Sequence, residues 1–371
     1  MEREQRERGS VVELPGPFTF EGGTVLHRPR VAYETWGELN GQGDNAVLLV
    51  HALTGDSHAA SGGSSGDGRP GWWEGLIGPG QALDPERHFI LCTNLLGGCY
   101  GTSGPSDEDP AMGQPSACGF PVVTTRDMAR IQKCLLDHLG IRGLALMLGG
   151  SLGAMVVWEF IAEYPGFARR AAPLAGAPQT SPWAVAFNAV ARQAIVNDPA
   201  WLGGRYAGPG PVRGLSLARQ LAMTTYRTDR LFGQRFGRDR EDQDAARGLD
   251  PRNPFQVERY LHHQGEKLVG RFDARTYLAL TGAMDLHDVA RDRGGLEAAL
   301  SRVQTAVLSV GIGTDVLFPA WEMREAAELL ARLGKEAAYA ELASPYGHDA
   351  FLVEYGQINP MIAAFLGGRL P

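Results

Sequence analysis

The stretch Gly149-Gly150-Ser151-Leu152-Gly153 directly follows the apolar run 144–148 and precedes a segment with helical patterning. This arrangement predicts a nucleophile elbow, a sharp turn between a strand and a helix that presents a serine hydroxyl to a cleft. Small residues are needed because the strand and helix backbones approach closely, and Gly149 and Gly153 meet that need. The same pattern also occurs by chance in a chain with 49 glycines, so its meaning depends on the surrounding sequence.

The bulk composition is that of a soluble globular protein. The chain has 371 residues, 44% hydrophobic and 21% charged, which suits one large domain with an insertion or two ordinary domains. Its net charge of -7 argues against nucleic acid or an anionic membrane as a partner. No apolar stretch approaches the roughly 20 residues that span a bilayer. Residues 1–8 form a mixed-charge tail unlike a signal peptide, so we expect a cytoplasmic protein.

The four cysteines give no sign of a metal site. Cys92, Cys99, Cys118 and Cys134 form no C-x-x-C pair and no metal-ligand spacing. This usage is typical of reduced thiols in a reducing compartment. We therefore expect no bound metal.

Strand and helix signals alternate along the first half of the chain. Short apolar runs at 46–50 and 89–93 each end in a loop, and 125–139 carries apolar residues at helical spacing. The elbow leads into a helix at about 154–164, and another apolar run follows at 171–175. Such alternation predicts an α/β fold with a mostly parallel sheet and helices on both faces.

The pattern changes between residues 178 and 296, where helical stretches alternate with loops rich in Gly, Pro and Arg. Strand signals return at 305–310 and 338–342. We therefore predict a core domain formed by residues 1–177 and 297–371, interrupted by a helical lid at 178–296, called here the helical insertion. Residues 61–71, rich in Gly and Ser, are predicted to form a mobile loop.

A serine nucleophile needs a base and a group that orients the base, and in the α/β-hydrolase fold these follow in the order Ser, acid, His. Ser151, Asp315 and His348 fit this order, each just after a predicted strand. Asp315 would fix the tautomer of His348, which would accept the Ser151 proton and return one to the leaving group. Of the nine histidines, only His348 combines the expected loop with the expected order.

The loop after the first buried strand, 51–55, has a separate expected role. In this fold such a loop supplies one backbone N–H to the oxyanion hole, and the residue after the nucleophile supplies the other. We assign these donors to Leu53 and Leu152. Ordinary packing of the Leu53 side chain is the alternative interpretation.

Longer motifs extend these signals along most of the chain, in order: His51-Ala52-Leu53-Thr54-Gly55, Gly71 to Gly80, Leu96 to Pro105, Phe120 to Asp127, Ala186-Phe187-Asn188, Arg192 to Ile195, Tyr260 to Lys267, Arg271-Phe272-Asp273 and Ser344 to Phe351. Together they resemble the homoserine O-acyltransferases of methionine biosynthesis, a family of the α/β-hydrolase superfamily. The set is far more specific than the elbow alone.

The resemblance implies a ping-pong transfer of acetyl from acetyl-CoA, through a Ser151 acyl-enzyme, to the hydroxyl of L-homoserine. Acetyl-CoA would be a co-substrate, with no cofactor, and the protein would be a homodimer joined through the helical insertion. By the same resemblance Arg219, Tyr226 and Asp349 would hold the amino acid. The chemistry agrees, because a guanidinium binds a carboxylate and a carboxylate binds an ammonium group. A solvated surface position is the alternative for Arg219.

Other activities remain open at this point. Leu152 and Ala154 depart from the common family elbow, and 175–183 is similar to related succinyltransferases. Succinyl-CoA as donor and L-serine as acceptor are therefore alternatives, since a pocket discriminates one methylene by only about 1–3 kcal/mol. A more distant alternative is ester hydrolysis, which a water-excluding lid would oppose. A non-catalytic module would require a broken triad, and all three residues are present.

Overall fold

A single eight-stranded sheet organises the molecule in this computed structural model, which describes residues 9–109, 114–115, 119–242 and 252–370. The charged tail 1–8 and Cys118 lie outside these residues. The strand order is β1-β4-β6-β5-β9-β10-β11-β12. The bounds are β1 Ser10–Glu13, β4 Arg30–Trp36, β5 Ala46–Val50, β6 Phe89–Thr93, β9 Leu146–Gly150, β10 Arg170–Leu174, β11 Ala306–Ile312 and β12 Ala337–Leu342.

The six strands from β6 to β12 run parallel, and β1 and β4 add an antiparallel edge. Because the carboxyl ends of parallel strands meet at one edge, the loops after β5, β9, β11 and β12 lie together. Two small hairpins complete the strands: β2 Phe18–Thr19 with β3 Val25–Leu26, and β7 Glu108–Asp109 with β8 Gln114–Pro115.

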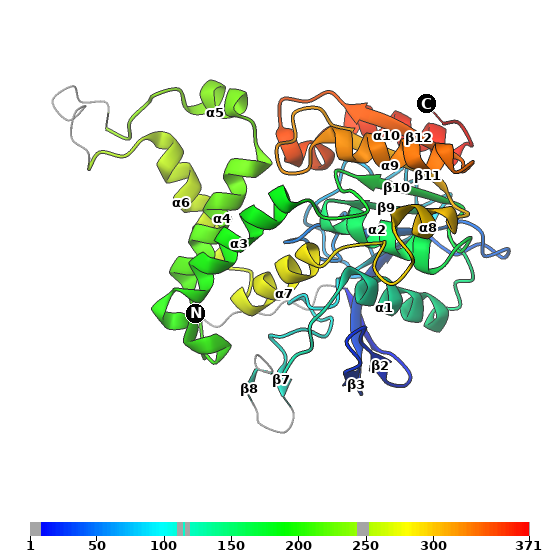
Figure 1. The fold of residues 1–371 in the computed structure, drawn as a ribbon, viewed down its shortest axis with the longest axis horizontal. Helices are drawn as coiled ribbons and strands as arrows, with labels where there is room; N and C mark the ends of the chain where they lie inside the picture. The colour runs from blue at the N-terminus through cyan, green and yellow to red at the C-terminus, as the bar shows by residue number, and fades with distance from the viewer. Residues whose placement is uncertain (1–8, 110–113, 116–118, 243–251, 371) are drawn as a thin grey trace.

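Helices cover both faces of the sheet, as Figure 1 shows. On β5, Leu48 and Val50 join the core under α1, α2, α8 and α9, whereas Val47 and Leu49 join the core under α10. Every residue of β5 is buried, which explains its uninterrupted apolar sequence. These helices span Thr125–His138 (α1), Leu152–Glu163 (α2), Leu296–Ser301 (α8), Ala320–Arg332 (α9) and Tyr355–Leu366 (α10).

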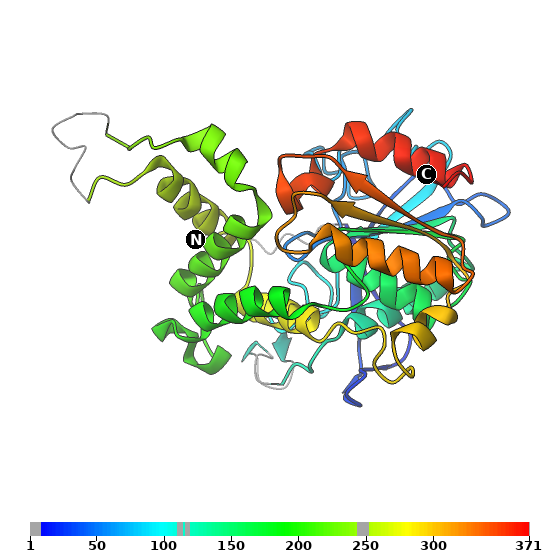
Figure 2. The ribbon, with the colours of Figure 1, turned by 45° about the horizontal axis from the view of Figure 1, so that its top comes forward.

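The chain leaves the sheet after β10 and returns at α8. In between, it forms helices α3 Pro182–Val196, α4 Val212–Tyr226, α5 Asp229–Phe236, α6 Gln256–Val269 and α7 Ala274–Asp285, with a 3-10 turn, η1, at Pro199–Gly204. Figures 1 and 2 show most of these helices to one side of the sheet. Across the described segments, no helix combines the length and apolar character needed to cross a bilayer.

The predicted parallel sheet with helices on both faces is confirmed, and strand and helix bounds agree within a few residues. Strands β1 and β4 were not predicted. The mobility of the glycine-rich loop 61–71 stays a prediction, and the structure shows that two carboxylates bond to it. The Ser61 N–H donates to Glu74 Oε2 at 2.8 Å, and the Ser65 hydroxyl bonds to Glu34, which is buried.

Candidate active site

Ser151 occupies a strained turn between β9 and α2. Its φ of 58° and ψ of -122° place a non-glycine residue in a sparsely populated backbone region. The Ser151 N–H donates to the carbonyl of Leu174 at 2.9 Å, which ties the turn to the neighbouring strand β10. Strain of this kind is maintained only when the surroundings fix it, and here it lifts the serine side chain above the sheet edge.

The predicted need for small residues around Ser151 is confirmed. A Cβ on Gly153 would lie 2.2 Å from the carbonyl oxygen of Val50, at the end of β5. A Cβ on Gly149 would lie 2.6 Å from the carbonyl carbon of Gly153. Both separations are shorter than any real carbon contact, so α2 reaches the sheet only if these positions lack side chains.

The structure brings Ser151, His348 and Asp315 into one hydrogen-bonded chain. The Ser151 hydroxyl lies 2.8 Å from His348 Nε2, and His348 Nδ1 lies 2.6 Å from Asp315 Oδ2. The other Asp315 oxygen accepts backbone N–H groups of Leu317 and Phe318 at 2.8 and 3.0 Å. Because the carboxylate accepts at Nδ1, Nε2 is left to accept the serine proton.

The side chains of Ser151, His348 and Asp315 are all buried. Their surroundings set the basicity of His348. Burial lowers the pKa of His348, but the charge of Asp315 and its hydrogen bond outweigh burial, so the net pKa is raised above 6.5. Aromatic rings of Tyr226, Phe318 and Phe351 surround the imidazole at centroid distances of 5.6, 5.3 and 5.4 Å. The arrangement therefore provides a base whose protonated form is stabilised.

Two other buried histidines have structural partners instead. His51 Nδ1–H donates to the Ala52 carbonyl at 2.7 Å, and His51 Nε2 accepts the Leu95 N–H at 3.0 Å. Burial lowers the pKa of His51. His287 lies between Thr125 and the carbonyl of Ala177, and burial lowers its pKa to about 3. Both rings are therefore neutral connectors within the core.

The two expected oxyanion donors lie on segments that meet at the elbow. A Cβ on Gly153 would be 3.0 Å from the carbonyl oxygen of His51, which shows how closely the loop after β5 approaches α2. Leu152 is the first residue of α2, where helix geometry leaves the N–H without a partner. Within the described residues, neither the Leu53 nor the Leu152 N–H donates to a protein acceptor.

Arg219 and Tyr226 both lie on α4, and Tyr226 packs beside the triad. The Arg219 guanidinium carbon is 5.4 Å from the Tyr226 ring centroid, and the Tyr226 ring packs against His348. Burial raises the pKa of Tyr226, so its hydroxyl stays protonated. Asp349 follows His348 in the 3-10 turn η3, Gly347–Leu352. The structure thus places near Tyr226 the other two residues that the family resemblance assigned to the acceptor.

One partner of this group was missed by sequence analysis. Arg227 Nε donates to Asp349 Oδ2 at 3.1 Å, an ion pair between the end of α4 and η3. These residues are 122 positions apart, and Arg227 belongs to none of the motifs quoted above. Its position directly after Tyr226 was the one available signal.

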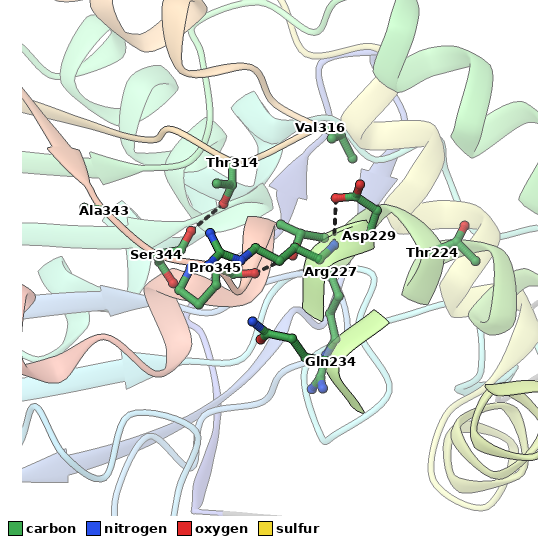
Figure 3. Close-up of a pocket in the computed structure, with 11 residues that line it drawn as sticks. Thr224, Arg227, Asp229, Gln234, Thr314, Val316, Ala343, Ser344 and Pro345 are labelled. Atoms are coloured by element: carbon green, nitrogen blue, oxygen red, sulfur yellow. Dashed lines mark hydrogen bonds between the residues drawn. The ribbon is translucent and has the colours of Figure 1, made fainter. Parts of the chain in front are cut away.

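A pocket of about 840 Å³ adjoins the loops that carry Asp315 and His348 (Figure 3). Its walls come from the end of α4, from α5 and from the loops after β11 and β12. The Thr228 hydroxyl donates to the Pro345 carbonyl at 2.5 Å, and the Thr314 hydroxyl donates to the Ser344 carbonyl at 2.7 Å. Ser151, Asp315 and His348 are not among the described residues that line it. The described residues also hold no cluster of His, Cys, Asp or Glu arranged for a metal ion.

Comparison with known proteins places the fold in a class. Residues 45–355 match the family model described as the alpha/beta hydrolase fold. A solved structure, esterase E22, superposes with a TM-score of 0.88 at 29% identity and covers 96% of this chain and 99% of its own. The fold and the hydrogen-bonded Ser-His-Asp chain are those of α/β-hydrolase enzymes.

The relatives define the family more narrowly. A homoserine O-acetyltransferase of Symbiobacterium thermophilum is 49% identical over 98% of this chain and 95% of its own length. One from Carboxydothermus hydrogenoformans is 46% identical over 94% of this chain and 92% of its own. The structure of homoserine O-acetyltransferase from Bacillus anthracis superposes with a TM-score of 0.89 at 29% identity, covering 96% and 97% of the two chains. The chain belongs to the homoserine O-acetyltransferase family.

The geometry of the triad predicts a pH dependence of acylation. Neutral His348 accepts the serine proton, so the single-turnover acylation rate should fall as pH drops through the His348 pKa, with a midpoint above 6.5. Asp315→Asn removes the charge that raises this pKa. In that variant the midpoint should move to lower pH, and kcat/KM should fall by about 10³–10⁴-fold. A midpoint that stays in place in Asp315→Asn would rule out Asp315 as the partner of the base.

Proposed function

We propose that the protein is a homoserine O-acetyltransferase that transfers acetyl from acetyl-CoA to the hydroxyl of L-homoserine. The observation that carries the proposal is the cluster beside His348, where the Tyr226 ring packs against the imidazole and lies under the Arg219 guanidinium, and Asp349 directly follows His348. A cation and an anion close to the base suit a zwitterionic acceptor. Relatives that are 49% and 46% identical to this chain are named for the same reaction.

In the first half-reaction, Ser151 Oγ attacks the thioester carbonyl while His348 Nε2 takes its proton. Negative charge then develops on the carbonyl oxygen, where the N–H groups of Leu53 and Leu152 would stabilise it. The intermediate collapses by breaking the carbon–sulfur bond, and CoA leaves with the proton from His348. Ser151 is left as an acetyl ester.

In the second half-reaction, the L-homoserine hydroxyl gives its proton to His348 and attacks the ester carbonyl. The same two N–H groups would stabilise the second tetrahedral intermediate. The bond to Ser151 Oγ breaks, Ser151 regains the proton, and O-acetyl-L-homoserine leaves. Asp315 remains a carboxylate throughout and stabilises the imidazolium that forms in each half-reaction.

Recognition of the acceptor rests on charge pairing. The Arg219 guanidinium would bind the α-carboxylate through two parallel hydrogen bonds, and Asp349 would bind the α-ammonium. Arg227 already occupies one oxygen of Asp349. A carboxylate has about four lone-pair sites, so the second oxygen remains able to accept from the substrate. Arg227 would therefore fix the orientation of Asp349 before the acceptor arrives.

We propose acetyl as the group carried, and L-homoserine as the acceptor, in methionine biosynthesis in the cytoplasm. The relatives reported above are named acetyltransferases. The rings of Phe318 and Phe351 beside His348 offer an apolar wall that suits a methyl group better than a second carboxylate. The helical insertion would act as the lid that keeps water from the acyl-enzyme.

The transfer reaction is tested by following free CoA and O-acylhomoserine with acetyl-CoA or succinyl-CoA as donor. We expect acetyl-CoA to be preferred and CoA release to depend on L-homoserine. Ser151→Ala should abolish the covalent acyl-enzyme, because no other nucleophile contacts His348 Nε2 among the described residues. CoA release that is equally fast without an acceptor would instead identify a hydrolase.

Arg219→Ala should impair only the second half-reaction. Loss of hydrogen bonds to a charged group costs about 1.5–3 kcal/mol, so KM for L-homoserine should rise about 10- to 100-fold. Acyl-enzyme formation from acetyl-CoA should be largely kept. Arg213→Ala, on an exposed position of the same helix, is the matched control. The reverse pattern, slow acylation with unchanged KM for L-homoserine, would place Arg219 at the CoA site.

We also propose a homodimer joined through the helical insertion, which carries exposed apolar side chains at Trp183, Val190, Leu202 and Leu217. Sedimentation should give about twice the chain mass of 39.9 kDa. Val190→Lys combined with Leu217→Lys should shift the protein to the monomer, since buried unpaired charge is costly. Val122→Lys, at an exposed valine outside the insertion, should leave the mass unchanged. A dimer that persists in the double variant would exclude this interface.

A further inference from the structure

The loop that carries Leu53 is held firmly at its sheet end. The His51 ring bonds to the Ala52 carbonyl and to the Leu95 N–H, and the Gly55 N–H donates to the Ala52 carbonyl at 2.9 Å. These bonds connect the start of the turn to the loop after β6. They do not hold its outer side, where the carbonyl and hydroxyl of Thr54 face the helical insertion.

Arg271 bonds to that outer side. It lies between α6 and α7, and its Nη1 donates to the Thr54 carbonyl at 2.7 Å while its Nη2 lies 3.3 Å from the Thr54 hydroxyl. The Tyr100 hydroxyl fixes Arg271 in turn: it donates to the Arg271 carbonyl at 2.6 Å and accepts from Nη1 at 3.1 Å. One guanidinium therefore links the insertion, the loop after β6 and the turn 51–55.

We propose that Arg271 is a positioning residue that holds the Leu53 N–H in the oxyanion hole and makes its placement depend on the helical insertion. The inference rests on the proposed function. An oxyanion donor must be aimed in advance at the oxygen that gains charge, because reorganisation during the reaction cancels its benefit. Hydrogen bonds from a guanidinium are stronger than neutral ones, so the Thr54 carbonyl is a firm anchor one residue away from Leu53.

This role differs in its consequences from simple attachment of the insertion. The oxyanion hole serves both half-reactions, whereas Arg219 and Asp349 serve only the acceptor. Misplacing Leu53 should therefore lower kcat for every ester and thioester substrate and leave KM for L-homoserine unchanged. A purely structural role would lower the melting temperature without lowering kcat selectively at unchanged KM. Arg271 is exposed, so its removal leaves no cavity in the core.

Arg271→Ala should reduce kcat about 10- to 100-fold, the scale expected when a catalytic group is displaced without being removed. The same loss should appear in acylation by p-nitrophenyl acetate, a small ester that needs neither the CoA site nor the acceptor site. Arg271→Lys should recover part of the rate, because an ammonium group can reach the Thr54 carbonyl but lacks the second donor. Thr54→Val, which keeps the carbonyl, should stay within about threefold of the parent enzyme.

Arg259→Ala is the control, since it also removes an exposed arginine from the insertion, on α6. The proposal is overturned if Arg271→Ala matches this control, or if only KM for L-homoserine changes. It is also overturned if the rate loss is fully accounted for by a lowered fraction of folded protein. Should the parent enzyme acylate with p-nitrophenyl acetate yet transfer nothing to L-homoserine, the proposed function fails while Arg271 remains testable on the ester.

Discussion

The close contact between the first turn of α2 and the end of β5 determines the rest of the site. With no side chain at Gly153, the helix backbone reaches the carbonyl oxygens of Val50 and His51. That approach forces the chain to reverse sharply at Ser151, so the strained backbone there follows from packing. It also places the Leu152 N–H beside the turn 51–55. The positions of the serine and of the two proposed oxyanion donors therefore follow from a single backbone contact.

Much of the core could be predicted because its residues carry local signals. Strands such as β5 and β9 are buried on both faces and read as continuous apolar runs. β4 has no continuous apolar run, because buried and half-buried residues are mixed along it. It also carries a charged residue, Glu34, which is buried and bonds to His58. The triad was predictable from its order along the chain, since the fold fixes which loops meet.

The remaining contacts of the site join residues that no local pattern connects. Arg227 and Asp349 are 122 positions apart, and Arg271 and Thr54 are 217 apart. Such pairs depend on how the helical insertion packs against the core domain. Composition and periodicity do not reveal that packing. The resemblance to a family supplied Arg219, Tyr226 and Asp349, but it did not show that Asp349 has a cationic partner of its own.

The first and last segments of the insertion are hydrogen-bonded to each other. The Val289 N–H donates to the Pro178 carbonyl, and the Thr180 N–H donates to the His287 carbonyl, both at 3.0 Å. Beyond this point Arg293 bonds to buried Glu159 on α2 at 2.8 Å, and Arg126 on α1 shares the same carboxylate. Buried ion pairs add little net stability, but they disfavour other arrangements of the same segments. The end of the insertion is therefore bonded to α2, the helix that begins directly after Ser151.

The triad alone does not decide between transfer and hydrolysis, since an esterase superposes on this chain almost as well as a homoserine O-acetyltransferase. Both activities need the same base, acid and oxyanion hole. What differs is the competitor for the acyl-serine: water is abundant but unoriented, whereas a bound acceptor has its hydroxyl aimed at the ester. Orientation of this kind is worth effective concentrations of about 10⁵–10⁸ M, far above that of any solvent. If Arg219 and Asp349 bind the acceptor, as we propose, these two side chains are the part of the site that favours transfer.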